Sequence, residues 1–228
     1  MRFRKLLLAA ALAVLALASA QEVQRHGLVF EKWVRDTFFD GYQPASYTQR
    51  WDIPAAANKN HGNVPVNPKV CKYGTAVDLG DALRQFEIDE PFLLIVGFWR
   101  QEGDTKRIVQ MIAPEISPAL WRKLWGPVTL ADLQRLDALI KDPARPAAET
   151  RRLALQMKNS PPFTEAIIQV NPKIGADGQR RLQCSLRFSE VFKHLAPGTD
   201  SAPQAHPTLF GLEYPGPIAS PPRGTGRD

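Results

Sequence analysis

The sequence predicts a mixed α/β fold, in which a central mixed β-sheet is flanked by helices. Phe92 to Arg100 is a continuous apolar run, short for a buried helix and typical of a central strand that is covered on both faces. Other segments repeat apolar residues every three or four positions, as amphipathic helices do. Strand-like segments also occur in pairs around turn-forming residues, which is typical of β-hairpins.

The N-terminal part predicts a helix, a hairpin and a second helix. Spacings of three and four between apolar residues indicate the first helix. Alternating polar and apolar residues indicate the two antiparallel strands, the first of which ends at Pro54. Asp78 has the residue type and position of an N-cap for the second helix. The expected bounds are Glu22–Phe39 for the first helix, Tyr47–Ile53 and Val64–Tyr73 for the strands, and Val77–Phe86 for the second helix.

After the central strand, we expect a partner strand, three helices, a second hairpin and a last helix. Thr129 precedes a periodic segment and is followed three residues later by Asp132, which predicts a capped helix start. Ser189 is expected to cap the last helix. The expected bounds are Lys106–Ile112 for the partner strand, Pro118–Trp125, Thr129–Lys141 and Ala147–Asn159 for the helices, Ala166–Asn171 and Arg181–Phe188 for the hairpin, and Glu190–Leu195 for the last helix.

The first twenty residues, 1–20, predict a cleaved signal peptide. Three basic residues precede the apolar run Leu6 to Leu17, which is too short to span a bilayer. Ala18-Ser19-Ala20 then has the small-x-small pattern of a cleavage site. We therefore expect a secreted or periplasmic protein that is cut after Ala20, with an uncleaved membrane anchor as the alternative. No later segment predicts a transmembrane helix.

The rest of the chain predicts one domain, residues 21–196, and a tail, residues 197–228. A domain of this size can bury a normal core. The tail is rich in proline and glycine and shows no sustained apolar periodicity, which predicts a largely disordered segment. Within it, Thr208 to Tyr214 carries apolar residues that could dock on the domain.

The net charge and the two cysteines exclude no class of partner and leave a disulfide open. The chain carries 29 basic and 23 acidic residues, a net charge of +6, but the signal peptide holds three of the basic residues and its loss leaves +3. Such a mildly basic protein indicates no particular partner. Cys71 and Cys184 could form a disulfide in an oxidising compartment, or each could be a small buried apolar side chain.

Two acids and a lysine predict a metal-dependent phosphodiesterase. Asp52 ends one expected strand and Lys69 lies on its partner, so both reach one edge of the sheet. Glu31 follows Phe30 at the border of the buried helix stripe, where a carboxylate can reach a cleft. Mg²⁺ or Mn²⁺ takes oxygen ligands and activates water for attack on a phosphate. A nearby lysine can orient that water or offset charge on the phosphate.

Each of these residues also has an ordinary structural interpretation. Glu31 could pair with Lys32 or Arg35 on its own helix. Asp52 could belong only to a turn, and Lys69 could be a solvent-facing strand lysine.

The order of these elements resembles the PD-(D/E)xK restriction-endonuclease-like nucleases, and type II restriction enzymes in particular. That family has an acid-bearing helix, a hairpin with Asp on one strand and Asp/Glu-x-Lys on the next, and then a helix and a further strand. The resemblance covers roughly residues 27–112. It rests on Gly27-Leu28-Val29-Phe30-Glu31, Trp51-Asp52-Ile53-Pro54, Val66-Asn67-Pro68-Lys69, the strand Phe92 to Trp99, Lys72-Tyr73-Gly74 and Asp78 to Arg84.

The resemblance implies an αβββαβ-type core with extra C-terminal helices and a hairpin. It implies an endonuclease that cleaves DNA with Mg²⁺ or Mn²⁺, with Asp52, Lys69 and Glu31 as catalytic residues. The metal ligands would be Asp52, Asn67 and Glu31. DNA is the implied partner, and a homodimer remains open.

Asn67 departs from the family pattern, which has an acid at this position. Its amide oxygen can still bind a metal but carries no charge, and Pro68 removes one donor from the strand ladder. These features and the export signal support an alternative, a catalytically degenerate DNA- or protein-binding module of the cell envelope. A third possibility is an unrelated α/β envelope protein.

Basic residues near aromatic ones are further candidates for DNA contact. The alternative is a solvated face whose tryptophans point inward. Residues 179–185 carry side chains that can hydrogen-bond guanine or adenine edges. The histidines show no metal spacing, and only His61 lies beside the expected site. The basic clusters are Arg100 with Lys106 and Arg107, Arg180 with Arg181 and Arg187, and Arg122-Lys123 between Trp121 and Trp125.

Overall fold

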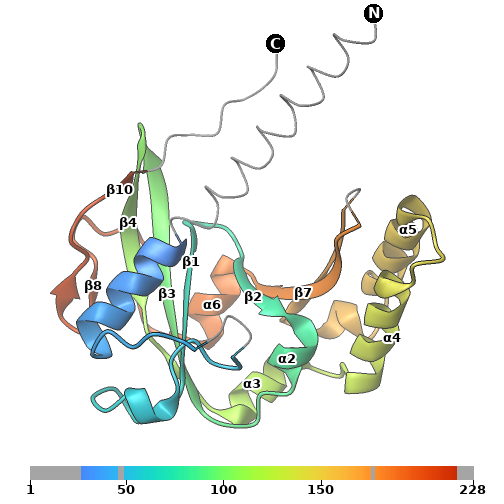
Figure 1. The fold of residues 1–228 in the computed structure, drawn as a ribbon, viewed down its shortest axis with the longest axis horizontal. Coiled ribbons are helices and arrows are strands. Elements are labelled where there is room, and N and C mark those ends of the chain that lie inside the picture. The colour runs from blue at the N-terminus through green and yellow to red at the C-terminus, as the bar shows by residue number, and fades with distance from the viewer. Residues whose placement is uncertain (1–26, 46–48, 176–177, 220–228) are drawn as a thin grey trace, which may run out of the picture.

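A computed structural model describes residues 27–45, 49–175 and 178–219 (Figure 1). Its main sheet contains β1, β3, β4 and β10 in that order, and β5 also pairs with β3. β1 runs parallel to β3, and the other pairs are antiparallel. The expected mixed α/β class is therefore confirmed. The strands are Val66–Lys72 (β1), Phe92–Glu102 (β3), Thr105–Ile112 (β4), Glu115–Ile116 (β5) and Ile218–Ala219 (β10).

A second, antiparallel sheet has the order β2-β7-β6 and curls away from the first (Figure 1). Two helices, α4 and α5, pack against it, and a short helix, α2, contacts both β2 and β7. The C-terminal hairpin expected from the sequence is thus present as β6 and β7. The bounds are Val77–Asp81 (β2), Gln169–Ile174 (β6), Arg180–Leu186 (β7), Ala82–Phe86 (α2), Leu130–Lys141 (α4) and Ala147–Lys158 (α5).

The remaining elements cover the main sheet. The first helix, residues 27–38, packs on one face, and α3 and α6 pack on the other. A small hairpin of β8 and β9 lies beside the first helix (Figure 1). The bounds are Ala55–Ala57 (η1), Pro118–Trp125 (α3), Phe163–Glu165 (η2), Phe188–His194 (α6), Thr208–Leu209 (β8) and Leu212–Glu213 (β9).

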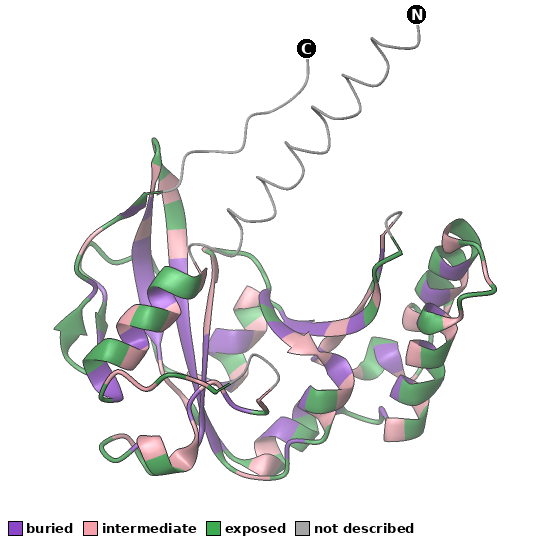
Figure 2. Cartoon of the chain, in the orientation of Figure 1, coloured by how far each residue is buried: buried purple, intermediate pink, exposed green. Residues whose placement is uncertain are grey.

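Strand β3 carries two cores because both of its faces are covered. Successive side chains of a strand point to opposite faces, so Leu94 and Val96 join the core beneath α3 and α6. Leu93 and Ile95 join the core beneath the first helix. This explains the unbroken apolar run, and Figure 2 shows the central strands as buried.

Gly97 lets the first helix approach the sheet closely. A Cβ atom at this position would lie 2.6 Å from Cε2 of Phe30 and 2.7 Å from its Cζ, well inside van der Waals contact. The ring of Phe30 therefore occupies the space of a missing side chain. Since Glu31 is the next residue on the helix, this contact also helps to place its carboxylate.

Several helix starts follow the expected capping chemistry. The side chain of Ser117 accepts a hydrogen bond from the amide of Leu120 at the start of α3. Thr129 and Asp132 form a reciprocal capping box at the start of α4. Such caps satisfy amides that the helix itself leaves unpaired.

The expected strand over Tyr47–Ile53 is wrong for the residues that the structure describes. Only Ile53 pairs, in one antiparallel bridge with Val66, and residues 46–48 lie outside the described residues. Pro54 cannot donate to a ladder, and the 3-10 turn η1 begins directly after it. The long partner of β1 is therefore β3.

The expected helix over Val77–Phe86 is half correct. Val77 and Leu79 alternate into the core with a period of two, so the first half is strand β2. Asp81, rather than Asp78, caps the helix that follows by accepting from the amide of Arg84.

The last helix, α6, starts earlier than expected. It begins at Phe188, with Arg187 in the cap position and no side-chain cap bond. Ser189 lies inside this helix and is not its cap. Phe188 packs against Phe98 of β3, with ring centroids 5.1 Å apart, and this contact favours the earlier start.

The described part of the tail, residues 197–219, belongs to the body, and the expectation of disorder does not hold for it. Leu209, Tyr214 and Ile218 are buried in the core beneath the first helix. The expected docking of Thr208 to Tyr214 is present as the β8–β9 hairpin. The expected signal peptide lies outside the described residues. Within the described ranges, no helix has the length and apolarity needed to cross a membrane.

Candidate functional site

Asp52 and Lys69 meet at the edge of β1. The Nζ atom of Lys69 lies 3.5 Å from Oδ2 of Asp52, and their side chains are 24% and 40% exposed. Two backbone hydrogen bonds between Ile53 and Val66 hold the segment of Asp52 against the strand. A partly exposed ion pair contributes little stability.

Residues on the N-terminal side of Asp52 fix it from a second direction. The guanidinium of Arg50 donates to the carbonyl of Glu87 and to Oδ1 of Asp89, both at 2.8 Å. The indole of Trp51 donates to Oε1 of Glu90 at 2.8 Å, and its ring packs against Phe92 in the core. Asp52 is thus held between a clamped loop and a strand edge.

Glu31 approaches the same place from the first helix. Phe30 and Val34 bury the apolar stripe of this helix and leave Glu31 on its flank. Burial raises the pKa of the Glu31 carboxyl, the charge on Lys69 lowers it, and the charge on Asp52 raises it again. Lys32, which was a possible partner of Glu31, forms its ion pair with Asp36 instead. The structure therefore brings Glu31, Asp52 and Lys69 together.

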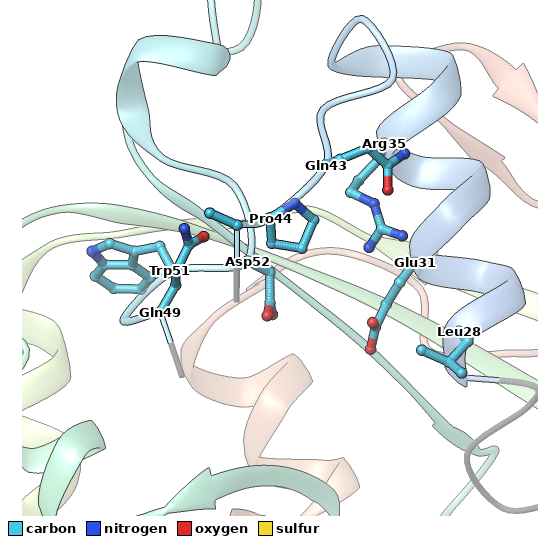
Figure 3. Close-up of a pocket in the computed structure, with 9 residues that line it drawn as sticks. Leu28, Glu31, Arg35, Gln43, Pro44, Gln49, Trp51 and Asp52 are labelled. Carbon is cyan, nitrogen blue, oxygen red and sulfur yellow. The ribbon is translucent and has the colours of Figure 1, made fainter. Parts of the chain in front are cut away.

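A cavity of about 240 Å³ lies between the first helix and the loop that leads to Asp52. Figure 3 shows the carboxylates of Glu31 and Asp52 and the guanidinium of Arg35 around this space. Lys69 does not line the cavity and reaches Asp52 from the strand. The other residues at its wall are Leu28, Gln43, Pro44, Ala45, Gln49 and Trp51.

Asn67 occupies a different environment from the one we expected for a metal ligand. Its side chain is 4% exposed, and Oδ1 has no hydrogen-bond donor. It shares a face of β1 with Lys69, two residues on, but it does not line the cavity. A buried acceptor without a donor destabilises the fold. Among the predicted site residues, Asn67 is therefore the one with a buried side-chain oxygen that accepts no hydrogen bond.

The donors at this cavity fit a hard divalent cation. Magnesium sites commonly use one or two carboxylates and complete their shell with water and substrate phosphate. A cation between Glu31 and Asp52 would offset the burial and the mutual repulsion that raise the pKa of Glu31. Within the described residues, no group of three or more His, Cys, Asp or Glu side chains is placed to hold a metal. The charged protein ligands would therefore be these two carboxylates.

The expected basic–aromatic clusters have mainly structural roles. Trp121 and Trp125 are buried, so the inward-pointing alternative is confirmed for them. Arg122 donates to the carbonyl of Val128 and lies over the ring of Phe86. Arg180 donates to backbone carbonyls around the α4–α5 loop.

Arg100 and Arg107 also have partners within the fold. The guanidinium of Arg100 lies 4.5 Å from the ring centroid of Tyr73, and Arg107 forms an ion pair with Glu102. These contacts explain both side chains without a nucleic acid.

His61 and the cysteines stand apart from the candidate site. The imidazole of His61 stacks on Phe210, with ring centroids 3.8 Å apart, and burial lowers its pKa. Cys71 and Cys184 are free thiols. Burial raises the pKa of Cys71 to about 12 and raises that of Cys184 as well, so neither is a reactive thiolate.

Arg35, Gln43 and Gln49 line the cavity although the sequence did not mark them as site residues. Arg35 follows Glu31 by four residues, and that spacing places two side chains on one helix face. This spacing is also typical of a local ion pair, so it does not by itself indicate a site. The two glutamines belong to irregular segments, for which no periodicity exists.

No family model, curated protein or solved structure matches the chain. The candidate site combines two carboxylates, a lysine and an arginine at one edge of a mixed sheet.

Proposed function

We propose that the protein is an exported, divalent-metal-dependent DNA endonuclease. The observation that carries the proposal is the meeting of Glu31, Asp52 and Lys69, which come from a helix, a loop and a strand. Convergence of this kind is what the resemblance to restriction-like nucleases requires. Signal-peptide cleavage after Ala20 belongs to the same proposal.

Each residue has a distinct role in the proposed reaction. Glu31 and Asp52 would hold Mg²⁺ or Mn²⁺, which supplies Lewis acidity toward the phosphate and a more acidic water. Lys69, whose ammonium already lies beside Asp52, would donate a hydrogen bond to the attacking water or to a phosphate oxygen. The clamp formed by Arg50 and Trp51 would keep Asp52 in place.

A polar face of the second sheet, on which Lys173 and Arg181 are exposed, supports DNA as the substrate. Residues directly opposite each other on paired strands share a face, which groups Asn171 with Gln183 and Lys173 with Arg181. Lys158 joins them by donating to Oδ1 of Asn171. Burial and the nearby charge of Lys173 lower the pKa of Lys158. A phosphate at this face would relieve that repulsion, and amide side chains can read base edges.

Cleavage of supercoiled plasmid tests the proposal. We expect the protein without its signal peptide to nick plasmid in Mg²⁺ or Mn²⁺ and to lose activity in EDTA. Asp52→Asn and Lys69→Met should each lower the rate by about 100-fold or more, with little change in the melting temperature.

Matched controls exclude a general effect of charge. Asp36→Asn changes an exposed acid on the first helix, and Lys72→Met changes the exposed lysine at the end of β1. Both should cleave as the parent does. If the parent protein does not nick DNA with either metal, the proposed nuclease activity is refuted.

A second candidate function is a DNA-binding module without catalysis. The specific observation in its favour is Asn67, a buried neutral side chain where the nucleases that the sequence resembles have an acid. If parent protein binds DNA without nicking it and Asn67→Asp gains cleavage, the site is a degenerate nuclease centre. If the parent protein binds DNA and Asn67→Asp gains no cleavage, the result favours a DNA-binding module without catalysis.

A further inference from the structure

Arg35 stands out at the cavity because its guanidinium has no ionic partner. Its Nε atom is buried and has no hydrogen-bond acceptor. In the described part of the chain no carboxylate lies within ion-pair distance of Arg35. An arginine stays charged at any physiological pH, and an unpaired buried donor is costly. The cavity therefore contains a guanidinium that forms no ion pair with any described residue.

Nearby acids on the same segment are engaged by other residues. Lys32 pairs with Asp36, one residue after Arg35, and Lys59 pairs with Asp40. Glu31 is close enough for Arg35 to lower its pKa, but the two side chains form no ion pair. Asp36 and Asp40 are thus paired with lysines, and Glu31 and Arg35 are left without an ion pair among the described residues.

The charges around the cavity favour an anion once a divalent cation is present. Glu31 and Asp52 carry two negative charges, and Arg35 and Lys69 carry two positive charges. A divalent cation at the carboxylates would leave a local excess of two positive charges. A phosphodiester is a matching ligand, since the planar guanidinium donates two parallel hydrogen bonds to two phosphate oxygens.

We propose that Arg35 binds a backbone phosphodiester of the nucleic acid, placing it against Glu31 and Asp52. This inference rests on the proposed function, which supplies the cation and the substrate. Figure 3 shows the guanidinium of Arg35 directed into the space between the helix and the Asp52 loop. Gln43 and Gln49 also line the wall, and Nε2 of Gln43 donates one hydrogen bond to the carbonyl of Gly41.

The test is DNA affinity, measured without turnover. In a Lys69→Met background with Mg²⁺, we would measure binding of a fluorescein-labelled duplex by anisotropy. Adding Arg35→Gln should weaken binding by about 10- to 100-fold, the value of one or two charge-assisted hydrogen bonds. Adding Arg35→Lys keeps the positive charge but loses the two parallel N–H donors of the guanidinium. Its affinity should lie between that of the background protein and that of the Arg35→Gln variant.

Arg135→Gln is the matched control because it removes an exposed arginine from α4. It should bind within twofold of the background protein. The same twofold result for Arg35→Gln, with an unchanged melting temperature, would overturn the inference. If Arg35→Gln does not fold, Arg35→Lys decides, and full affinity in that variant would overturn the two-bond contact.

Two further arms separate the possible outcomes. Duplexes with and without a 5′-phosphate should show the same dependence on Arg35; a dependence confined to the phosphorylated ends would refute binding of an internal phosphodiester. Plasmid nicking by otherwise unchanged protein reports on the proposed function separately. Loss of affinity in Arg35→Gln without any nicking by the parent would support the phosphate contact and refute the nuclease.

Discussion

At the scale of a single residue, burial makes the charged form of Glu31 unfavourable for the fold. Its carboxylate is partly buried without an ion pair, and burial raises its pKa. The folded protein then holds the proton more tightly than the unfolded chain does. This carboxyl therefore favours the fold at low pH, and that contribution is lost as the pH rises through the raised pKa.

The first prediction concerns Glu31→Gln. The substitution removes the unfavourable burial of a charge, so it should raise the melting temperature at pH 7 in the absence of metal. The difference should disappear below the pKa of an unfolded glutamate, about 4.3. Thermal melts from pH 3.5 to pH 8 measure this. A variant that is less stable than the parent at pH 7 would show that Glu31 is held by favourable contacts.

At the scale of elements, the first helix and β3 fit each other through one glycine. The ring of Phe30 fills the space that a side chain at position 97 would need. Interiors are packed too densely to absorb an extra methyl group. The same contact places the helix that carries Glu31, so packing and the candidate site depend on one another.

Gly97→Ala should destabilise the protein by about 1–3 kcal/mol and lower any cleavage rate, because the methyl group displaces Phe30. Denaturant unfolding gives the free energy. Gly27→Ala is the control, since nothing lies within 4 Å of a Cβ atom there. Equal stability of the two variants would mean that the helix shifts without cost.

The β8–β9 hairpin offers a second test at this scale. Leu209 is 2% exposed and Leu212 is 51% exposed. Leu209→Ala should cost about 2–4 kcal/mol through the cavity it leaves, while Leu212→Ala should cost less than about 0.5 kcal/mol. Unfolding curves of the two variants compare the same chemical change. Similar small costs would show that this segment does not contribute to the core.

The sequence predicted elements whose signal is local and regular. The apolar run of β3 and the capping box of α4 depend on neighbouring residues, and both are present. Residues Tyr47–Ile53 alternate like a strand, but strand formation needs a partner, and every residue of β1 is paired with β3. The disorder expected for the tail fails over residues 197–219 for the same reason, because Tyr214 packs against Phe30 and Trp33, which are far away in the sequence.

The candidate site was predictable in part. Glu31, Asp52 and Lys69 could be chosen because an acid-bearing helix and a lysine-bearing strand follow a recognisable order. The unpaired state of Arg35 could not be predicted, because it depends on which acids the lysines of neighbouring turns engage. The burial of Asn67 also depends on tertiary packing and could not be predicted from neighbouring residues.

At the scale of the whole molecule, the proposal assigns metal binding to the edge of the main sheet and contact with the DNA backbone to the second sheet. Lys69 lies on β1 of the main sheet, and the helix and loop beside this sheet carry Glu31 and Asp52. The second sheet carries Lys173 on β6, next to Lys158 at the end of α5. Phosphate contacts by lysine make DNA binding depend on salt, since each contact releases counterions. The salt dependence therefore reports whether the second sheet touches DNA.

Combining Lys158→Gln with Lys173→Gln should reduce the slope of log affinity against log salt by about 1–2. Anisotropy titrations from 50 to 200 mM salt give the slope. The control combines Lys59→Gln with Lys123→Gln, which removes two exposed lysines elsewhere. If both double variants change the slope equally, binding depends on net charge and not on this face.

The central claim is that Glu31 and Asp52 share one divalent cation. Crystals grown with Mn²⁺ and measured near the manganese absorption edge test it most directly. The proposal predicts an anomalous peak in contact with both carboxylates, and the loss of that peak in Asp52→Asn. Absence of a peak at these residues in well-ordered, manganese-saturated crystals of the parent protein would contradict it.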